Sequence, residues 1–317
     1  MLNATLEDVA ARGARSTAYA AVFGAVAALG LPLNAAALWI LLTRNNLKSP
    51  SVVFMVNLAL SDLLLVAALT TRVYFYAAGV WPLGVLACVW FTMLFINNVR
   101  SSAIFITFIS VDRLLAVVYP VRSRHRRTAA NAWKAAALVW LFVMAANVPE
   151  SLDFADFLNN SSESGCFEFS RGPRRSVAAY ASPALVLAML AVNVASTAAV
   201  SLTLRARLND SARVKNKVNV VLIFAVNLAM FAVFFLPASL AVFFVGSAPT
   251  PTPLVCLASV NCCLDPLLYY FSFDGFWRRA EHERPCRGVR DEGTSPSGFF
   301  VSPHPETQRT DDTLLQT

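Results

Sequence analysis

The sequence predicts an all-α membrane protein: a bundle of seven transmembrane helices followed by a short amphipathic eighth helix. Of the 317 residues, 57% are hydrophobic and 14% are charged, whereas soluble domains carry about 25% charged residues. Seven apolar segments reach the length of about 20 residues that a helix needs to cross a bilayer. They cover residues 16–43, 51–79, 85–119, 130–149, 177–204, 215–246 and 254–272.

The third segment has the feature around which the others are best arranged. It is apolar until it reaches an ionised pair, Asp112 and Arg113, near its end. Such a pair is costly in a membrane unless it lies at an interface and has a function. At 1.5 Å per residue a helix over 85–119 is about 50 Å long, enough to cross the bilayer at a tilt. We therefore expect this helix to organise the bundle.

The distribution of Lys and Arg predicts the orientation of the chain. Seventeen of them lie in four of the connecting regions, which are 44–50, 120–134, 205–217 and 278–290. Five lie in the four alternating regions, 1–15, 80–84, 150–176 and 247–253. The basic set faces the cytoplasm by the positive-inside rule, which puts the N-terminus outside and the C-terminus inside. The glycosylation acceptors Asn3, Asn159 and Asn160 fall on the predicted outside, in agreement.

We divide the chain into an extracellular N-terminus (1–15), a transmembrane domain (16–272), an amphipathic helix (273–287) and a disordered cytoplasmic tail (288–317). Residues 1–15 lack the features of a cleaved signal peptide, so the first span is expected to direct insertion. Cys286 follows the basic amphipathic stretch and is a candidate palmitoylation site, the alternative being a free cysteine. The tail is rich in Ser, Thr, Pro and Asp, which favours disorder and phosphorylation.

Two cysteines, Cys88 and Cys166, lie on the predicted outer side, one at a helix mouth and one in the second outer loop. The extracellular space is oxidising, so we predict a disulfide between them rather than two free thiols. Such a bond would tie the loop over the bundle.

Polar residues inside the spans need partners. Asp62 and Asp265 are the two deep carboxylates, and we expect them to share a polar centre with Asn34, Ser102 and Asn261. Two carboxylates in a low dielectric cannot both ionise cheaply, so the centre should hold a cation, with Asp62 as its ligand, or a shared proton. A hydrogen-bond network without an ion is an equally weighted alternative. No other cofactor is expected.

Several functions are disfavoured. The three histidines, His125, His282 and His304, lie in polar segments, which leaves no intramembrane general base of the usual kind. No convincing hydrolase motif is present, so we do not expect an enzyme. No internal repeat supports a transporter, and no basic stripe with interleaved aromatics supports nucleic-acid binding.

A series of motifs, in helix order, resembles the signatures of rhodopsin-like (class A) G-protein-coupled receptors. They are Gly30-Leu-Pro-Leu-Asn34, Asn57-Leu-Ala-Leu-Ser-Asp62, Ser110-Val-Asp-Arg-Leu-Leu-Ala-Val-Val-Tyr-Pro120, Trp140, Phe234-Phe-Leu-Pro237 and Asn261-Cys-Cys-Leu-Asp-Pro-Leu-Leu-Tyr-Tyr270. The last motif and Phe235 resemble the purinergic-like and lysophospholipid branch. Within it, the segments 30–39 and 270–276 are most similar to those of type 5 lysophosphatidic acid receptors.

This resemblance implies a plasma-membrane receptor that activates heterotrimeric G proteins and binds arrestin through its phosphorylated tail. It implies an activation switch at Arg113, held by Asp112 at rest, and a sodium site at Asp62, Ser102, Asn261 and Asp265. It also implies a sixth-helix hinge and a seventh-helix switch, formed by Phe235 and Pro237 and by Asp265, Pro266 and Tyr269 respectively. Pro237 removes one helical hydrogen bond, which fits bending of the sixth helix.

Some positions depart from the family pattern. The third-helix motif ends Asp-Arg-Leu, and no carboxylate occurs between Arg213 and Asn227 to pair with Arg113. The third outer loop is short, because 28 positions separate Pro237 from Asp265. These departures motivate a second hypothesis, a non-signalling or decoy heptahelical protein.

The charges within the spans favour an anionic ligand. Phe95 stands 18 residues before Arg113, where an amine receptor needs a carboxylate. Arg72 lies about 15 Å outward of Asp62, at a position that resembles the headgroup-contacting arginine of the lysophosphatidic acid branch. Arg100 lies about 18 Å below Cys88. We expect Arg72, Arg100 and Phe95 to line a site for a lysophospholipid, with a nucleotide or other small organic anion as the alternative.

The two arginines also have structural interpretations. Arg72 could snorkel to the interface instead of binding a ligand. Arg100 could be a buried arginine satisfied by backbone carbonyls and by hydroxyls such as those of Ser102 or Ser196.

Overall fold

The computed structural model describes residues 2–43, 47–160, 166–168, 180–206, 224–244 and 251–272. Side chains are described from Arg12 onward, except those of residues 242 and 267–272. All of these residues belong to one compact unit, and they contain helices and turns but no strand. The predicted helix 273–287, the tail 288–317 and Cys286 lie outside the described residues, as do the side chains of Asn3 and Tyr269.

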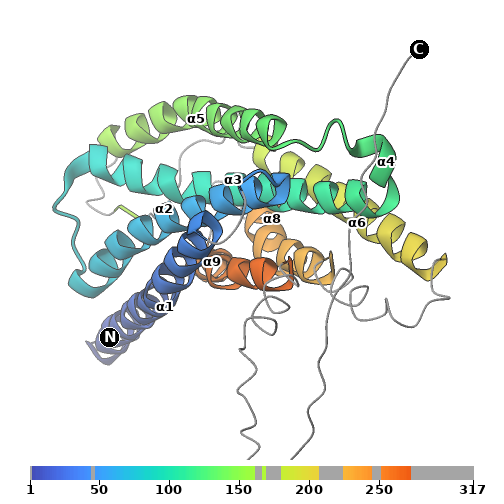
Figure 1. The fold of residues 1–317 in the computed structure, drawn as a ribbon. Coiled ribbons are helices and arrows are strands. Elements are labelled where there is room, and N and C mark those ends of the chain that lie inside the picture. The colour runs from blue at the N-terminus through green and yellow to red at the C-terminus, as the bar shows by residue number, and fades with distance from the viewer. Residues whose placement is uncertain are drawn as a thin grey trace, which may run out of the picture. The chain divides into compact units, whose positions relative to one another are not determined.

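The described segments follow the predicted order of spans (Figure 1). The helices are α1 (Leu2–Thr43), α2 (Pro50–Ala78), α3 (Gly84–Val118), α4 (Pro120–Ser123), α5 (Ala129–Asn160), α6 (Ala181–Ala206), the π-helical segment η3 (Phe231–Phe235), α8 (Leu236–Phe244) and α9 (Thr252–Ser272). Residues 224–230, which precede η3, are also helical. Six segments are long and apolar enough to cross a membrane, and α9 occupies the place of the seventh predicted span.

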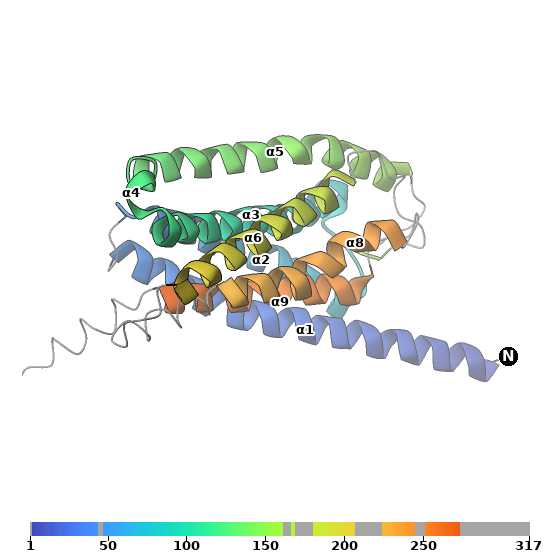
Figure 2. The same cartoon turned by 90° about the vertical axis from the view of Figure 1, so that its right-hand side faces the viewer.

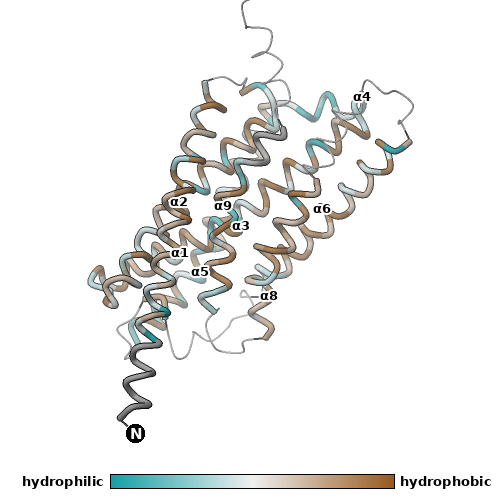
Figure 3. The backbone as a smooth tube through the Cα atoms, turned by 90° about the horizontal axis from the view of Figure 1, so that it is seen from below, coloured by the Kyte–Doolittle hydropathy of each residue, from teal (hydrophilic) through white to brown (hydrophobic). Residues whose placement is uncertain are grey.

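Apolar residues predominate along the helices, as the colouring by hydropathy in Figure 3 shows. Many large apolar side chains remain exposed, for example Leu138, Leu141 and Phe142 on α5. In a protein that spans a membrane, these side chains face lipid rather than water.

The third span occupies the interior of the bundle, as its sequence predicts. α3 packs against α2, α5, α6 and η3, whereas α1 packs against α2 and α9. Figure 2 shows α5 on one side of α3, with α9 and α1 on the other. The end of α3 at Cys88 is called here the disulfide end, and the end at Asp112 the Arg113 end.

The predicted fourth span ends at Pro149, whereas α5 continues through this proline for 11 more residues and ends at Asn160. Hydropathy ends the span at Glu150, because Asp153 and Asp156 follow. The helix continues because Phe154, Phe157 and Leu158, spaced for one helical face, pack against a cluster around Cys88 and Cys166. The first part of the predicted second outer loop is therefore helical, and so are residues 2–15 before the first span.

The sixth span changes its helical pitch beside Pro237. Proline has no N–H, and its ring clashes with the carbonyl four residues earlier. The π-helical segment Phe231–Phe235 lies directly before it, and the N–H of Leu236 donates to the carbonyl of Phe231, five residues back. The ring of Phe235 is buried and packs 5.3 Å from that of Phe231. The change in helical pitch thus lies at the residues that the sequence analysis assigns to the sixth-helix hinge, and the hinge itself stays a prediction.

α1 and α9 are joined at a second proline. Pro266 lacks the N–H that would reach the carbonyl of Cys262. The side-chain amide of Asn34 donates to that carbonyl at 2.7 Å instead. Gly30, one turn away on α1, permits the close approach, because a Cβ there would lie 3.0 Å from the sulfur of Cys262.

Candidate ligand-binding and switch sites

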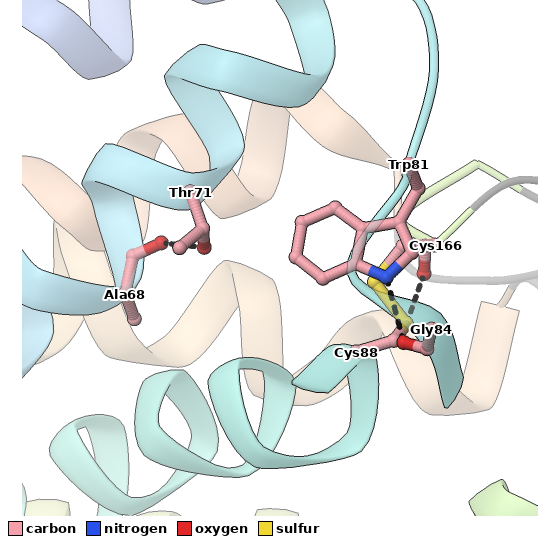
Figure 4. Close-up of a disulfide and its surroundings, with 6 residues drawn as sticks. All are labelled: Ala68, Thr71, Trp81, Gly84, Cys88 and Cys166. Carbon is pink, nitrogen blue, oxygen red and sulfur yellow. Dashed lines mark hydrogen bonds between the residues drawn. A yellow bond between two sulfur atoms is a disulfide. The ribbon is translucent and has the colours of Figure 1, made fainter. Parts of the chain in front are cut away.

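The predicted disulfide between Cys88 and Cys166 is present and anchors residues 166–168 to the start of α3. A tight turn precedes it. Gly79 and Gly84 adopt φ of 71° and 77°, which favours glycine, and between them Trp81 donates to the carbonyl of Gly84 at 2.8 Å (Figure 4). Phe167, next to Cys166, packs edge-on against Trp81 with ring centroids 5.4 Å apart. The disulfide thereby places Phe167 over the interior of the bundle.

Arg72 points into this end of the bundle and is enclosed by aromatic rings. Its guanidinium carbon lies 5.8, 4.9 and 4.3 Å from the ring centroids of Phe23, Phe95 and Phe167. These rings come from α1, α3 and the disulfide-bound segment, and we call the set the Arg72 cage. The residue is 6% exposed, and its Nε has no hydrogen-bond partner among the described residues. Arg72 therefore does not snorkel to the surface.

Phe95, which the sequence analysis expects to line the ligand site with Arg72, forms part of the wall of this cage. Arg100, also predicted to bind ligand, lies elsewhere. It donates to Oδ1 of Asn147 at 3.0 Å and forms an ion pair with Glu150. These partners on α5 differ from the expected hydroxyls of Ser102 and Ser196. They were missed because Glu150 falls beyond the end that hydropathy assigns to the fourth span.

The polar centre forms between α2, α3 and α9, but its hub is Asn98, a polar residue of the third span that the sequence analysis does not assign to the centre. Asn98 donates to Oδ1 of Asp62 at 3.0 Å and to the hydroxyls of Ser61 and Ser102 at 3.2 and 3.1 Å. Ser102 also donates to Asp62, at 3.5 Å. The predicted members Asp62 and Ser102 are thus joined by the side-chain amide of Asn98, which stands one turn before Ser102 on α3.

The two carboxylates of the centre are close enough to interact. Asn261 donates to Oδ2 of Asp265 at 2.8 Å. Oδ2 of Asp62 and Oδ1 of Asp265 accept no hydrogen bond from the described residues. Two buried carboxylate oxygens without donors, beside the hydroxyl of Ser102, fit either a small hard cation or a shared proton. Asn34 lies apart from them, on the carbonyl of Cys262.

At the Arg113 end, Asp112 is held by two other residues. Arg127 donates from Nε and from its terminal nitrogen to the two oxygens of Asp112, at 2.8 and 3.1 Å. The hydroxyl of Ser51, on α2, donates to the same carboxylate. Arg127 belongs to the basic connection after α3, and its pairing with Asp112 was not predicted. Arg113 is the next residue along α3 and is partly buried.

Two buried asparagines connect α3 to its neighbours. Asn193, on α6, donates to the hydroxyl of Thr107 at 2.9 Å. Asn227, in the sixth span, donates to the hydroxyl of Ser110 at 2.7 Å. Asn227 and Ser110 are both fully buried. Ser110 lies three residues before Arg113 along α3. The sixth span is therefore joined to α3 by an uncharged hydrogen bond.

Two glycosylation candidates, Asn159 and Asn160, occupy the last turn of α5. The side chain of Asn160 donates to the carbonyl of Asp156 at 2.8 Å and is exposed.

Comparison with known proteins agrees with this architecture. Residues 33–269 match the family model of the 7 transmembrane receptor (rhodopsin family). The chain is 33% identical to lysophosphatidic acid receptor 4 of Mus musculus over 276 residues, which cover 81% of this chain and 74% of that receptor. It is 32% identical to lysophosphatidic acid receptor 6 of Gallus gallus over 281 residues (81% and 91%). It is 34% identical to lysophosphatidic acid receptor 5 of Bos taurus over 281 residues (80% and 76%).

The chain therefore belongs to the rhodopsin-like (class A) family of seven-transmembrane, G-protein-coupled receptors. Within that family it falls in the lysophosphatidic acid branch. It is a multi-pass protein of the plasma membrane and a receptor, not an enzyme.

Proposed function

We propose that this receptor binds an extracellular lysophospholipid with a phosphate headgroup, similar to lysophosphatidic acid, and activates a heterotrimeric G protein. The named activities of its relatives support this ligand class. In this proposal the disulfide end lies outside and the Arg113 end faces the cytoplasm. The excess of Lys and Arg in the connections at the Arg113 end supports that orientation.

The Arg72 cage is the observation that carries the proposal. A buried guanidinium loses its hydration, and aromatic faces return only part of the lost energy. A phosphate placed on Arg72 would supply two parallel charge-assisted hydrogen bonds and complete the site. The acyl chain would lie along the apolar side chains packed next to the cage, which include Val26, Leu65 and Leu69.

The transducing part of the proposal concerns the sixth span. The π-helical segment before Pro237 and the buried Phe235 are the hinge at which this span bends. Bending would separate residues 224–230 from α3 and open a groove beside Arg113 for the G protein. Asp265, Pro266 and Tyr269 form the switch of the seventh span, and a sodium ion on Asp62 and Asp265 favours the closed state. Arrestin binds the phosphorylated tail.

The experiment is an agonist dose response with lysophosphatidic acid, normalised to surface level. Arg72→Ala should weaken potency by about ten- to hundredfold, because charge-assisted hydrogen bonds contribute roughly 1.5–3 kcal/mol and about 1.4 kcal/mol is a factor of ten. Arg72→Lys should lose less, because the charge remains and only the two-pronged geometry is lost.

The matched control is Arg122→Ala, which removes an exposed arginine at the other end of the bundle. Its agonist binding should be unchanged. Wild-type potency in Arg72→Ala would refute the headgroup model, and activation by nucleotides instead of lysophosphatidic acid would assign the cage to a different organic anion. No G-protein response to any lysophospholipid or nucleotide would favour a non-signalling protein.

A further inference from the structure

A separate cavity of about 630 Å³ opens at the disulfide end, beside the N-terminal part of α1. Its walls are the stretch Arg12–Tyr19 of α1, the last turn of α2, Glu168 after the disulfide, and Thr252 at the start of α9. Its volume lies in the range of ligand-binding pockets. We call it the α1 vestibule.

One aromatic layer lies between the vestibule and the Arg72 cage. Tyr76 lines the vestibule, and its ring stacks on Phe23 with centroids 5.8 Å apart. Phe75 also lines it and packs edge-on against Phe167 at 5.4 Å. Phe23 and Phe167 are the rings that cover Arg72. Moving the rings of Phe75 and Tyr76 would therefore connect the vestibule to the cage rings Phe23 and Phe167, which lie directly over Arg72.

The charges of the vestibule suit an anion. Arg12 and Arg15 line it from one side, three residues apart on α1, and Glu168 is the one carboxylate among its lining residues. Side chains three apart on a helix are neighbours, so the two guanidinium groups share one face. Both arginines are exposed, whereas Arg72 is buried. Exposed charges act over a distance of about 8–10 Å and affect the rate of association more than the affinity.

We propose that the α1 vestibule is the capture site for the phosphate headgroup, from which the ligand passes the aromatic layer to Arg72. Arg12 and Arg15 attract the phosphate, and Tyr76 and Phe75 are displaced as it enters. This inference rests on the proposed function, because it assigns the route to the Arg72 cage. The ligand class that the vestibule would capture is a single-chain lipid with a phosphate monoester as its headgroup.

The test measures association and dissociation rates of fluorescent lysophosphatidic acid on membranes that contain the full-length receptor. Arg12→Gln/Arg15→Gln should slow association on the order of tenfold at low ionic strength, because steering charges are lost. Its dissociation rate should stay within about twofold of wild type, since the contacts of the bound ligand remain. Added salt should slow wild-type association more than that of the variant.

Two controls isolate the vestibule. Arg12→Lys/Arg15→Lys keeps both charges and should restore fast association. Arg122→Gln/Arg124→Gln removes the same charge from the opposite end and should leave both rates unchanged. Rate constants do not depend on the number of receptors, so a lower surface level does not hide the effect.

The outcomes separate this inference from the proposed function. An unchanged association rate in Arg12→Gln/Arg15→Gln overturns the capture site, and so does faster dissociation alone, which would place the bound headgroup in the vestibule. Loss of binding in Arg72→Ala, with no change of rates in Arg12→Gln/Arg15→Gln, leaves the proposed function intact.

Slower association in Arg12→Gln/Arg15→Gln, with normal binding by Arg72→Ala, supports the capture site and refutes the role of Arg72. Free inorganic phosphate that slows association as strongly as lysophosphatidic acid itself would show that the vestibule binds phosphate without regard to the lipid.

Discussion

Arg100 and Glu150 form an ion pair within the apolar part of the bundle, with side chains 6% and 20% exposed. Asn147, one turn before Glu150, accepts a second hydrogen bond from the same guanidinium. All the partners come from α5, so the pair joins α3 to α5. Arg72, by contrast, has rings in place of a carboxylate. The two buried arginines thus have different surroundings: a carboxylate and an amide around Arg100, and aromatic rings around Arg72.

Removing one member of the Arg100–Glu150 pair should destabilise the receptor more than removing both. Glu150→Ala leaves the buried guanidinium of Arg100 without its carboxylate, which should lower the free energy of unfolding by about 3 kcal/mol. This value is at the low end of the range for broken buried ion pairs, because the side chain of Glu150 is 20% exposed. Arg100→Leu/Glu150→Leu should recover much of that loss. Thermal unfolding of the purified receptor measures the difference, and a double variant less stable than Glu150→Ala would contradict it.

At the scale of elements, α3 is tied to two neighbouring spans by chemically similar bonds. Asn193 connects it to α6, and Asn227 connects it to the sixth span. Only the second bond joins parts that must separate if the sixth span opens. The sequence has no carboxylate between Arg213 and Asn227, and we expect the Asn227–Ser110 bond to stabilise the closed position of the sixth span.

Asn227→Ala should raise basal signalling. A hydrogen bond of about 1 kcal/mol in the closed state corresponds to a roughly fivefold change in the ratio of open to closed receptor. Ser110→Ala should have a similar effect, and the double variant should add little, since either change removes the same bond. Basal nucleotide exchange on the G protein, per receptor at the surface, is the measurement.

Asn193→Ala is the matched control, because it removes a buried amide–hydroxyl bond that does not involve the sixth span. We expect it to lower stability without raising basal activity. Equal basal activity in both asparagine variants, or a wild-type level in Asn227→Ala, would show that the Asn227–Ser110 bond is not a latch.

For the whole molecule, the disulfide closes a sequence separation of 78 residues and holds Phe167 over Arg72. In the chain-entropy model, closing a loop of that length stabilises the folded state by about 4–5 kcal/mol. Cys88→Ser, Cys166→Ser and the double variant should therefore lose similar stability, and all three should respond more weakly to lysophosphatidic acid. Thermal unfolding and dose response test this, and a double variant that is much less stable than either single variant would argue against the bond as the cause.

The sequence predicts the positions of the seven spans and the disulfide because length, hydropathy and the count of outer cysteines determine them. It does not predict which side of α3 faces α2. Asn97 and Asn98 point about 100° apart, and only packing selects Asn98 as the partner of Asp62. Arg127 and Glu150 were missed for another reason. Both lie just outside the apolar segments, where hydropathy carries no information on tertiary contacts.

The bond between Asn34 and Cys262 has a consequence for the biosynthesis of the receptor. Its two partners are 228 positions apart, so the first span enters the membrane long before the last one is made. Until then the amide of Asn34 has only the carbonyl of Gly30, within its own helix. In a nascent chain stopped before the seventh span, the second N–H of the Asn34 amide would therefore lack the acceptor that α9 provides in the finished receptor.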